Sequence, residues 1–254
     1  MKQYINHLYF KIKVAFFYWG VWLINQLIRP NCLDVKNIPI IINNRNRLTY
    51  MKMLISSLEK RGYNNIYIID NDSTYPPLLD YYSKECIYPV FYLNKNVGYN
   101  ALWDSGLIRK FRKNYFVYTD SDVVLSDECP ADILEKAYSI LGRYSKVHKV
   151  GPALEVKDIP EENWKAVWNT QSDSWQKVIH GDDFLLYEAM IDTTFALYRP
   201  FVTKHLGVFR IQIRMGYPYV AKHMPWYERE NHMPEDSLYY QQTANIESTW
   251  YKRS

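Results

Sequence analysis

From Ile38 onward, short apolar runs alternate with segments of helical spacing, and this alternation restricts the fold more than any other feature of the chain. Four apolar runs predict buried strands: 38–43, 65–70, 88–93 and 115–119. Apolar residues three and four positions apart predict helices between them: 48–61, a short helix from Pro76, and roughly 99–112. Because strands that alternate with helices form βαβ units, we predict an α/β fold with a mixed, mostly parallel sheet flanked by helices.

The pattern is less regular after residue 125. The runs 150–156 and 184–198 predict strands, and the second is long enough to be bent or broken. The alternation over 208–215 predicts an antiparallel edge strand. We find no linker, repeat or low-complexity tract, so we predict one domain over 38–254, in two halves that meet near residue 125.

Composition fits a soluble globular protein. The 254 residues are 48% hydrophobic and 23% charged, which is enough apolar material for a full core. A net charge of +4 mildly favours anionic partners, but the basic residues are dispersed and no nucleic-acid-binding module appears. The cysteines are odd in number and widely spaced, which favours a reducing compartment and hence the cytoplasm: Cys32, Cys86 and Cys129.

Residues 1–37 form a separate apolar or amphipathic helical segment. Its apolar stretch, 14–28, is shorter than the roughly 20 residues that span a bilayer, and no signal-peptide cleavage site follows it. Two interpretations remain open. Residues 7–28 form an amphipathic helix at a membrane surface, which would make the protein peripheral at the inner face of the cell membrane, or they form a helix docked on the protein's own core.

Asp120 and Asp122 give the strongest local signal. They follow a buried strand one residue apart, so their carboxylates point the same way, and their repulsion is costly without a neutralising partner. A hard divalent cation, Mg²⁺ or Mn²⁺, is the natural partner and would bind diphosphate oxygens as well. The alternative is a solvated turn after a strand.

Polar residues also follow the earlier strands, in the segments Asn43–Arg47, Asp70–Ser73 and Asn94–Gly98. Together with Asp120 and Asp122, this ordered set resembles the GT-A glycosyltransferases, especially family 2. The resemblance covers roughly 38–125 and implies that the following residues contact a nucleotide-sugar donor: Asn43, Arg45, Asp70, Asn71, Ser73, Asn96, Gly98 and Asp120. It also implies that Asp122 binds the metal directly.

The resemblance implies a function for the whole chain. Residues 38–125 would be the nucleotide-sugar half and 126–254 the acceptor half. The expected activity is metal-dependent, inverting transfer of a hexose from a nucleotide-diphosphate sugar, uridine-linked in the simplest case, to a glycan or lipid-linked saccharide. Surface polysaccharide biosynthesis is the expected setting, with Mn²⁺ or Mg²⁺ as the cofactor and no nucleic acid involved.

The acceptor half must supply a general base. Asp192 lies within an apolar strand pattern, 70 residues after Asp122, and a carboxylate there can take the proton from an acceptor hydroxyl. Thr193 and Thr194 are the expected acceptor contacts. A turn aspartate paired with Thr194 is the alternative, Asp182 and Asp183 are competing bases, and the family's acidic pair before a helix is lacking.

His223 and Trp226 are the remaining candidates. The resemblance implies that a carboxy-terminal His completes the metal shell, and His223 fits that position, although a lone His is more often an ordinary core or surface residue. Trp226 is expected to stack on a sugar. Lys222 and Arg199 either neutralise the diphosphate or are ordinary surface charges.

Two rival functions differ in class. Asp120 and Asp122 also fit the opening motif of haloacid-dehalogenase-type phosphatases, as nucleophile and acid/base, with His180–Asp183 as the later acidic motif. That motif belongs on the first strand of its domain, whereas three predicted strands precede it here. The second rival is a non-catalytic, membrane-associated binding module.

Overall fold

The structure is a computed structural model. It describes residues 34–179, 183–192, 194–202, 211–229 and 232–244, and near the amino terminus residues 7–13, 15, 16, 19, 20 and 23. Several residues singled out from the sequence lie outside these ranges: Cys32, His180, Asp182 and Thr193.

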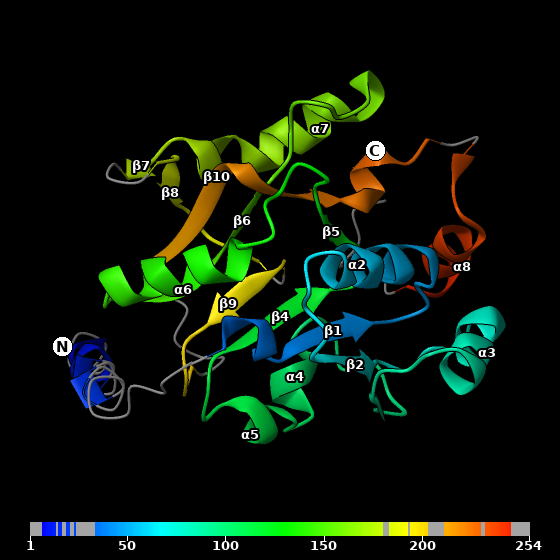
Figure 1. The fold of residues 1–254 in the computed structure, drawn as a ribbon, viewed down its shortest axis with the longest axis horizontal. Helices are drawn as coiled ribbons and strands as arrows, with labels where there is room; N and C mark the ends of the chain where they lie inside the picture. Colours follow the sequence, from blue (N-terminus) through cyan, green and yellow to red (C-terminus); the bar gives the residue numbers. More distant parts are fainter. Residues whose placement is uncertain are drawn as a thin grey trace.

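A mixed sheet runs through the centre of the molecule (Figure 1). Its order is β3-β2-β1-β4-β9-β6-β10-β8-β7, and β5 pairs with β10. The first four strands in this order are parallel, which confirms the predicted fold class. The described strands are β1 (Ile40–Asn44), β2 (Ile66–Asp70), β3 (Val90–Tyr92), β4 (Phe116–Asp120), β5 (Val123–Leu125), β6 (Val147–Leu154), β7 (Val178–Ile179), β8 (Leu186–Glu188), β9 (Ala196–Tyr198) and β10 (Ile211–His223).

Helices cover both faces of the sheet (Figure 1). Successive side chains of β1 point to opposite faces, so Ile40 and Ile42 pack toward α2 and α6 while Ile41 packs toward α4 and α5. The described α-helices are α2 (Thr49–Glu59), α3 (Pro76–Lys84), α4 (Ala101–Asp104), α5 (Ile108–Phe111), α6 (Ile133–Arg143), α7 (Glu161–Gln171) and α8 (Glu235–Thr243). The 3-10 helices are η1 (Val35–Asn37), η2 (Ser172–Trp175) and η4 (Met224–Tyr227).

Two predicted elements are divided in the structure. The helix expected over 99–112 is split into α4 and α5, because Gly106 between them has a φ of +79° that ordinary helical geometry excludes. The run 184–198 is broken into β8 and β9, as its length indicated.

The prediction of an antiparallel edge strand at 208–215 is wrong. The described strand β10 lies inside the sheet, parallel to β6 and antiparallel to β8 and β5. Its polar positions Gln212 and Arg214 are buried, so the alternation does not mark a solvent-facing side. These side chains bond to irregular backbone inside the protein instead.

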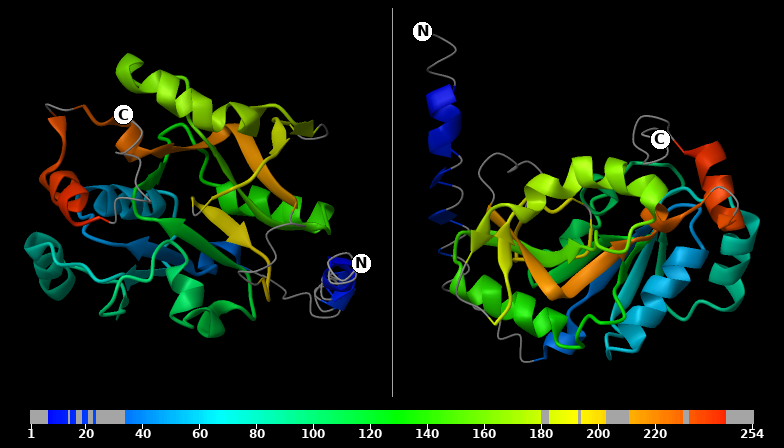
Figure 2. Two further views of the ribbon diagram at one scale, coloured as in Figure 1. Left: turned by 180° about the vertical axis from the view of Figure 1, so that it is seen from behind. Right: turned by 90° about the horizontal axis from the view of Figure 1, so that it is seen from above.

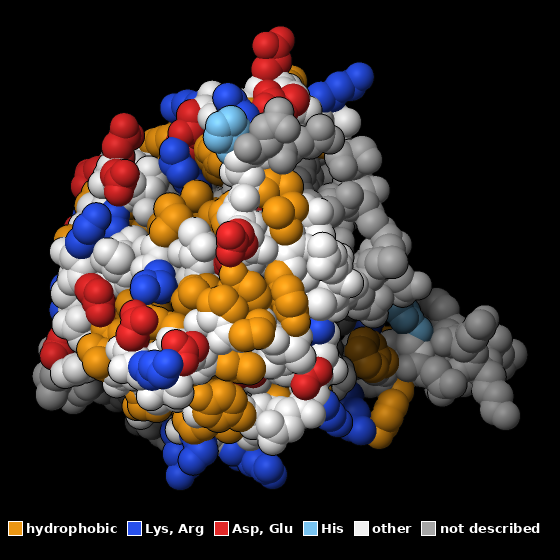
Figure 3. Space-filling view, turned by 90° about the vertical axis from the view of Figure 1, so that its right-hand side faces the viewer, with side chains coloured by type: hydrophobic (Ala, Val, Ile, Leu, Met, Phe, Trp, Pro, Cys, Tyr) orange, Lys and Arg blue, Asp and Glu red, His pale blue; other side chains and the backbone are white. Residues whose placement is uncertain are grey.

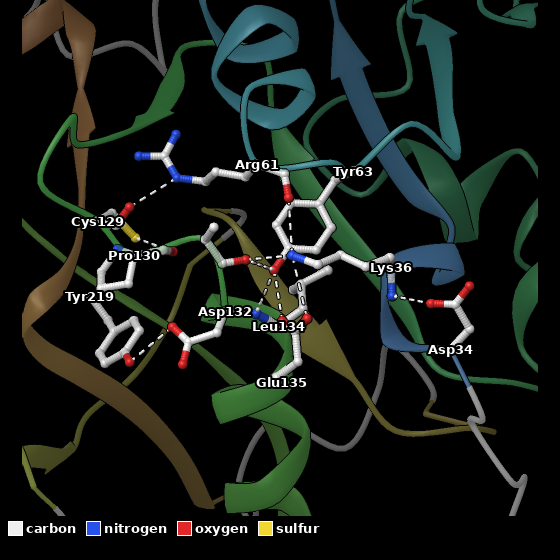
Figure 4. A network of polar contacts seen from close by, with 11 residues as sticks. Asp34, Lys36, Arg61, Tyr63, Cys129, Pro130, Asp132, Leu134, Glu135 and Tyr219 are labelled. Atoms are coloured by element: carbon white, nitrogen blue, oxygen red, sulfur yellow. Dashed lines mark hydrogen bonds and ion pairs between the residues drawn. The ribbon is translucent and has the colours of Figure 1, made fainter.

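A polar network ties η1 to the end of α2 and the start of α6, at the amino end of β1 (Figure 4). The Lys36 ammonium donates to the carbonyl oxygens of Arg61 (3.0 Å) and Ala131 (2.6 Å) and lies over the Tyr63 ring. The Tyr63 hydroxyl accepts from the Leu134 N–H at 3.2 Å. The network braces the end of the parallel strands opposite to their polar carboxyl ends.

The described part of the amino-terminal segment is exposed, and it stands apart from the sheet and its helices (Figure 2). Seven large apolar side chains there are 37–72% exposed: Leu8, Tyr9, Phe10, Ile12, Phe16, Trp19 and Leu23. Among these residues, the interpretation as a helix docked on the core therefore finds no support. No described helix combines the length and apolarity that crossing a bilayer requires.

The side of the molecule that carries α3 and α8 shows apolar side chains at its centre, with acidic and basic side chains interspersed around them (Figure 3). Exposed Leu79 of α3 and Leu238 of α8 contribute apolar surface to the described chain.

Candidate active site at the carboxyl ends of the parallel strands

Strand register brings the predicted donor-side loops to one edge of the sheet. Asn43 of β1 lies opposite Asp120 of β4, and Asn44 lies opposite Asp70 of β2. The Asn43 side-chain amide is 3.4 Å from the Asp120 carboxylate, to which it donates. Since parallel strands present their carboxyl ends to the same side, this edge is where a ligand of such a sheet binds.

Asp122 and His223 are neighbours, although they come from opposite halves of the chain. β5 pairs antiparallel with the end of β10 and sets His223 opposite Val123. The Met224 N–H donates to the Asp122 carbonyl at 2.9 Å, and the His223 Nε2 lies 3.8 Å from the Asp122 carboxylate. Asp122 lies two residues after Asp120, the last residue of β4, and His223 is the last residue of β10.

Arg47 joins this group, and the sequence did not single it out. Its guanidinium lies 3.7 Å from Oδ2 of Asp122 and 3.6 Å from Oε1 of Glu228. Arg47 and Glu228 are both buried, and Glu228 also accepts from the Tyr50 hydroxyl at 2.8 Å. The only sequence signal was its place in the polar segment Asn43–Arg47, in which Arg47 was given no role of its own.

Burial lowers the pKa of His223, and the nearby Arg47 lowers it further, while Asp122 opposes the shift. His223 is therefore neutral at neutral pH, with an imidazole lone pair available to a ligand. Its Nδ1 has no hydrogen-bond partner among the described residues.

The expectation that Trp226 stacks on a sugar does not fit its placement. Trp226 is 4% exposed, and its ring packs at 61° against that of His223, with centroids 4.8 Å apart. A stacking platform needs an open ring face, which this buried position lacks. Trp226 is instead a buried side chain that packs against the His223 imidazole.

Helix α8 covers the edge of the site from the carboxy-terminal side. The centroid of the Tyr240 ring lies 4.1 Å from the Arg47 guanidinium. Burial raises the pKa of the Tyr240 hydroxyl, Asp122 and Asp120 add to the shift, and Arg47 opposes it. Asp236 accepts from the N–H groups of Leu48 (2.6 Å) and Thr49 (2.8 Å), so it caps the amino end of α2. No spacing in the sequence pointed to these contacts.

Asp70 and Ser73 hold the second loop against the first. One Asp70 oxygen accepts from the Ser73 N–H at 3.0 Å, and the Ser73 hydroxyl accepts from the Asn46 N–H at 3.0 Å. The Asn46 side chain in turn accepts from the N–H of Thr74 at 2.6 Å. The other Asp70 oxygen is buried and has no hydrogen-bond partner among the described residues.

Asn71 links the second loop to the third. Its side chain accepts from the Val97 N–H and donates to the Gly98 carbonyl, each at 2.9 Å. Asn96 accepts from the Gly98 N–H at 2.9 Å, and Gly98 has a φ of +78° that suits glycine. These three residues fix the shape of a loop at the edge of the site, which is a structural use of the residues expected to contact the donor.

Buried polar atoms without a hydrogen-bond partner among the described residues gather at this edge. Most buried polar groups in proteins form hydrogen bonds, so a cluster of buried atoms without them needs a physical explanation. They are Oδ1 of Asn43 and Asn44, Nε and Nη1 of Arg45, Oδ2 of Asp70, Nδ1 of His223 and Oγ1 of Thr194, with Nε1 of Trp175 away from the strand ends.

Asp192 lies within electrostatic reach of the same group. Burial lowers the pKa of His223, and the charge of Asp192 opposes that shift as a minor contribution; the Asp192 side chain is exposed. No described hydrogen bond joins it to buried Thr194, so the alternative of a paired turn aspartate finds no support there. Burial raises the pKa of Tyr219, and the charge of Asp183, the competing base, adds a minor contribution to that shift. The Tyr219 hydroxyl donates to Asp132 at the start of α6 at 3.0 Å.

Arg199 and Lys222 do not face the site. The Arg199 guanidinium donates to the carbonyl oxygens of Leu141 and Tyr144 at the end of α6, where a cation offsets the helix dipole. Lys222 pairs with the Asp158 carboxylate. Their interpretation as diphosphate contacts is wrong for this arrangement.

The described residues contain no group of three or more His, Cys, Asp or Glu side chains arranged to hold a metal ion. Asp122 and His223 could supply two ligands, because their side chains are 3.8 Å apart, a separation that two metal–ligand bonds of about 2.1 Å can bridge. Proteins commonly bind Mg²⁺ through one or two carboxylates, and water and substrate phosphates complete its coordination shell. The residues therefore fit a metal site that a diphosphate completes.

No family model matches the chain, and a search of curated proteins gave no match. Solved structures do resemble it. One of them is GalNAc-T7 with UDP, GalNAc and Mn²⁺ (14% identity, TM-score 0.46, 75% of this chain and 45% of that chain). Glucosyl-3-phosphoglycerate synthase from Mycobacterium tuberculosis, with Mn²⁺ and UDP-glucose, is 14% identical (TM-score 0.43, 80% and 73%).

Two further structures extend the comparison. TarS from S. aureus, residues 1–349, is 14% identical (TM-score 0.41, 64% of this chain and 47% of that chain), and apo UDP-glucose pyrophosphorylase is 10% identical (TM-score 0.45, 81% and 99%). The chain thus spans less than half the length of TarS and GalNAc-T7. The fold of this chain resembles that of GT-A glycosyltransferases, as its motifs predicted. At TM-scores below 0.5 these similarities carry no functional argument, so the proposal below rests on the side chains.

Proposed function

We propose that this chain is a glycosyltransferase that moves a hexosyl group from a nucleotide-diphosphate sugar, UDP-linked, to a hydroxyl of a glycan or lipid-linked saccharide. The observation that carries the proposal is the gathering of unpartnered buried polar atoms beside Asp120 and Asp122 at the carboxyl ends of β1, β2 and β4. A polar, diphosphate-bearing ligand would satisfy both the donors and the acceptors in this set.

The donor side offers groups of the right chemistry. Asp70 is 3% exposed, and its unpartnered carboxylate oxygen suits an N–H of a base or an O–H of ribose. The unpartnered Nε and Nη1 of Arg45 suit phosphate oxygens. Asn71, Asn96 and Gly98 shape the loop beside them.

Asp122 and His223 would hold a divalent cation, Mn²⁺ or Mg²⁺, with Asp120 beside it. Such an ion stabilises the charge that develops on a departing diphosphate. Arg47 neutralises part of the carboxylate charge at Asp122, and the neutral state of His223 keeps its lone pair free for coordination.

On the acceptor side, Asp192 acts as the general base and takes the proton from the attacking hydroxyl, which corresponds to a single, inverting displacement. Thr194, whose hydroxyl has no partner among the described residues, and Thr193 beside it would contact the acceptor. Surface polysaccharide assembly is the proposed setting, because the amino-terminal segment suits a membrane face.

Released products test the reaction class. Incubating the chain with UDP-hexoses, Mn²⁺ and candidate acceptors is expected to release UDP, and a UDP-sugar is expected to raise the melting temperature only when Mn²⁺ is present. Release of inorganic phosphate from phosphate esters would support the phosphatase interpretation instead. A chain that binds saccharide but releases neither product would support the non-catalytic module.

We further propose that residues 7–28 dock on an anionic membrane surface from the cytoplasmic side. Phe16 and Trp19 are 72% and 60% exposed, and Lys11 and Lys13 accompany them. Burying a large apolar side chain contributes about 1.5–3 kcal/mol, so changing Phe16→Ser together with Trp19→Ser should weaken binding to phosphatidylserine-containing vesicles by roughly a hundredfold or more.

Cosedimentation with vesicles measures this binding, with pure phosphatidylcholine vesicles for comparison. Ile87→Ser is the matched control, because Ile87 is 82% exposed on the body of the protein and lies outside the segment. Undiminished binding by the double variant contradicts the membrane role.

A further inference from the structure

The segment Ala189–Asp192, between β8 and β9, carries the proposed base on irregular backbone. Without strand partners, its N–H and C=O groups need other hydrogen bonds. The Ala189 N–H donates to the Gln212 carbonyl at 3.3 Å, and the groups of residues 190–192 bond to side chains of two interior strands, β6 and β10.

Lys149 of β6 holds the end of this segment. Its ammonium donates to the carbonyl oxygens of Ile191 (2.5 Å) and Asp192 (3.0 Å), and it lies 3.1 Å from the Tyr198 hydroxyl of β9. The cation thus bonds to the backbone of the residue that carries the proposed base.

Gln212 and Arg214 of β10 hold the rest. The Ile191 N–H donates to the Gln212 side-chain oxygen at 2.5 Å. Arg214 donates twice to the Met190 carbonyl, from Nε at 2.9 Å and Nη2 at 2.7 Å. Gln212 is the register partner of Lys149, so all three side chains act from adjoining positions of two paired strands.

These contacts are made at a cost. Lys149, Gln212 and Arg214 are only 4–8% exposed, and burial of a cation is unfavourable unless its hydrogen bonds are satisfied. Burial lowers the pKa of Arg214 to about 10, and the charge of Asp192 opposes that shift. Apolar side chains would pack these strands without that cost.

We propose that Lys149, Gln212 and Arg214 form a clamp that fixes the backbone of residues 190–192 and so positions Asp192 for proton transfer. The inference rests on the proposed function, in which Asp192 is the base. These three are positioning residues, because they act on the reaction through the placement of Asp192.

Fixing the backbone of residues 190–192 would limit the positions that the exposed Asp192 carboxylate can take. Displacing a reacting group by about 1 Å costs up to roughly a hundredfold in rate. Loosening the segment should therefore reduce kcat by roughly ten- to a hundredfold while the KM for the donor stays unchanged, because the donor side is built from other loops.

Gln212→Met tests the clamp, since it removes the acceptor for the Ile191 N–H with little change in volume. Gln212→Glu keeps an acceptor oxygen and should restore most of the rate, and Gln176→Met makes the same change at an exposed position. Lys149→Met provides a second, independent loosening. Hydrogen exchange of the Ile191 amide reports the clamp itself and should quicken about tenfold in Gln212→Met.

The outcomes separate the clamp from the function on which it rests. Faster exchange with a lower kcat and an unchanged donor KM supports the clamp. Faster exchange with a normal kcat overturns the positioning role while the effect of Asp192→Asn, and with it the proposed function, still stands. If Asp192→Asn turns over like the wild type, the base assignment fails and the catalytic role of the clamp fails with it, and unchanged exchange in Gln212→Met overturns the clamp directly.

Discussion

Asp122→Asn is expected to lower metal-dependent transfer by about a thousandfold or more while the fold stays intact. The change removes the charge that would bind the cation and keeps the size of the side chain. A cation of this kind contributes several kcal/mol to stabilising a departing diphosphate, and each 1.36 kcal/mol is about tenfold in rate. Initial rates at a series of Mn²⁺ concentrations, with Mn²⁺ binding measured calorimetrically in the presence of UDP, check both halves of the expectation.

Asp127→Asn is the matched control, because Asp127 is an exposed aspartate a few residues further along the chain. It should leave the rate and the Mn²⁺ dependence unchanged. The melting temperature of Asp122→Asn shows whether the fold survives, since Arg47 keeps Glu228 as a partner. Near-normal turnover with an unchanged response to Mn²⁺ contradicts the role of Asp122 as a metal ligand.

The donor-side edge could be predicted from the sequence because it depends on local signals. Apolar runs located β1, β2 and β4, and parallel strands necessarily place their carboxyl ends together. The polar residues that follow each run, such as Asn43, Asp70 and Asp120, then had to meet. No long-range pairing needed to be known for this part of the site.

The other side of the site depends on pairing that periodicity does not encode. His223 reaches Asp122 because β5 pairs with the far end of β10, and the register of that pairing cannot be read from alternation. Only the family resemblance pointed to His223. The same limit explains the wrong edge assignment of β10, whose buried Gln212 and Arg214 imitate a solvent-facing pattern.

Helix α8 shows a third kind of limit. Its buried residues are the polar Asp236 and Ser237, so it has no apolar stripe that predicts where it docks. Asp236 caps α2, and Ser237 accepts from the Arg47 guanidinium at 2.9 Å. Contacts made by buried polar groups across about 190 positions of the chain become visible only in three dimensions.

Asp192→Asn is expected to lower kcat by roughly a hundred- to ten-thousandfold, the range that a positioned general base contributes. The amide keeps the shape and can still accept a hydrogen bond, but it cannot take a proton. Binding of the UDP-sugar should change little, because the donor contacts lie on the loops after β1, β2 and β4. Single-turnover rates, with donor affinity measured separately, distinguish a loss of chemistry from a loss of binding.

Asp183→Asn is the control for this prediction, because Asp183 is an exposed aspartate on the loop before β8 and the competing candidate for the base. A base is needed only while a hydroxyl is being deprotonated, so the deficit of Asp192→Asn should shrink with an acceptor whose nucleophile is already ionised at the assay pH. A deficit equally large with that acceptor, or equal losses in rate and donor affinity, would make Asp192 a binding residue. A collapse of activity in Asp183→Asn instead would move the base to the loop before β8.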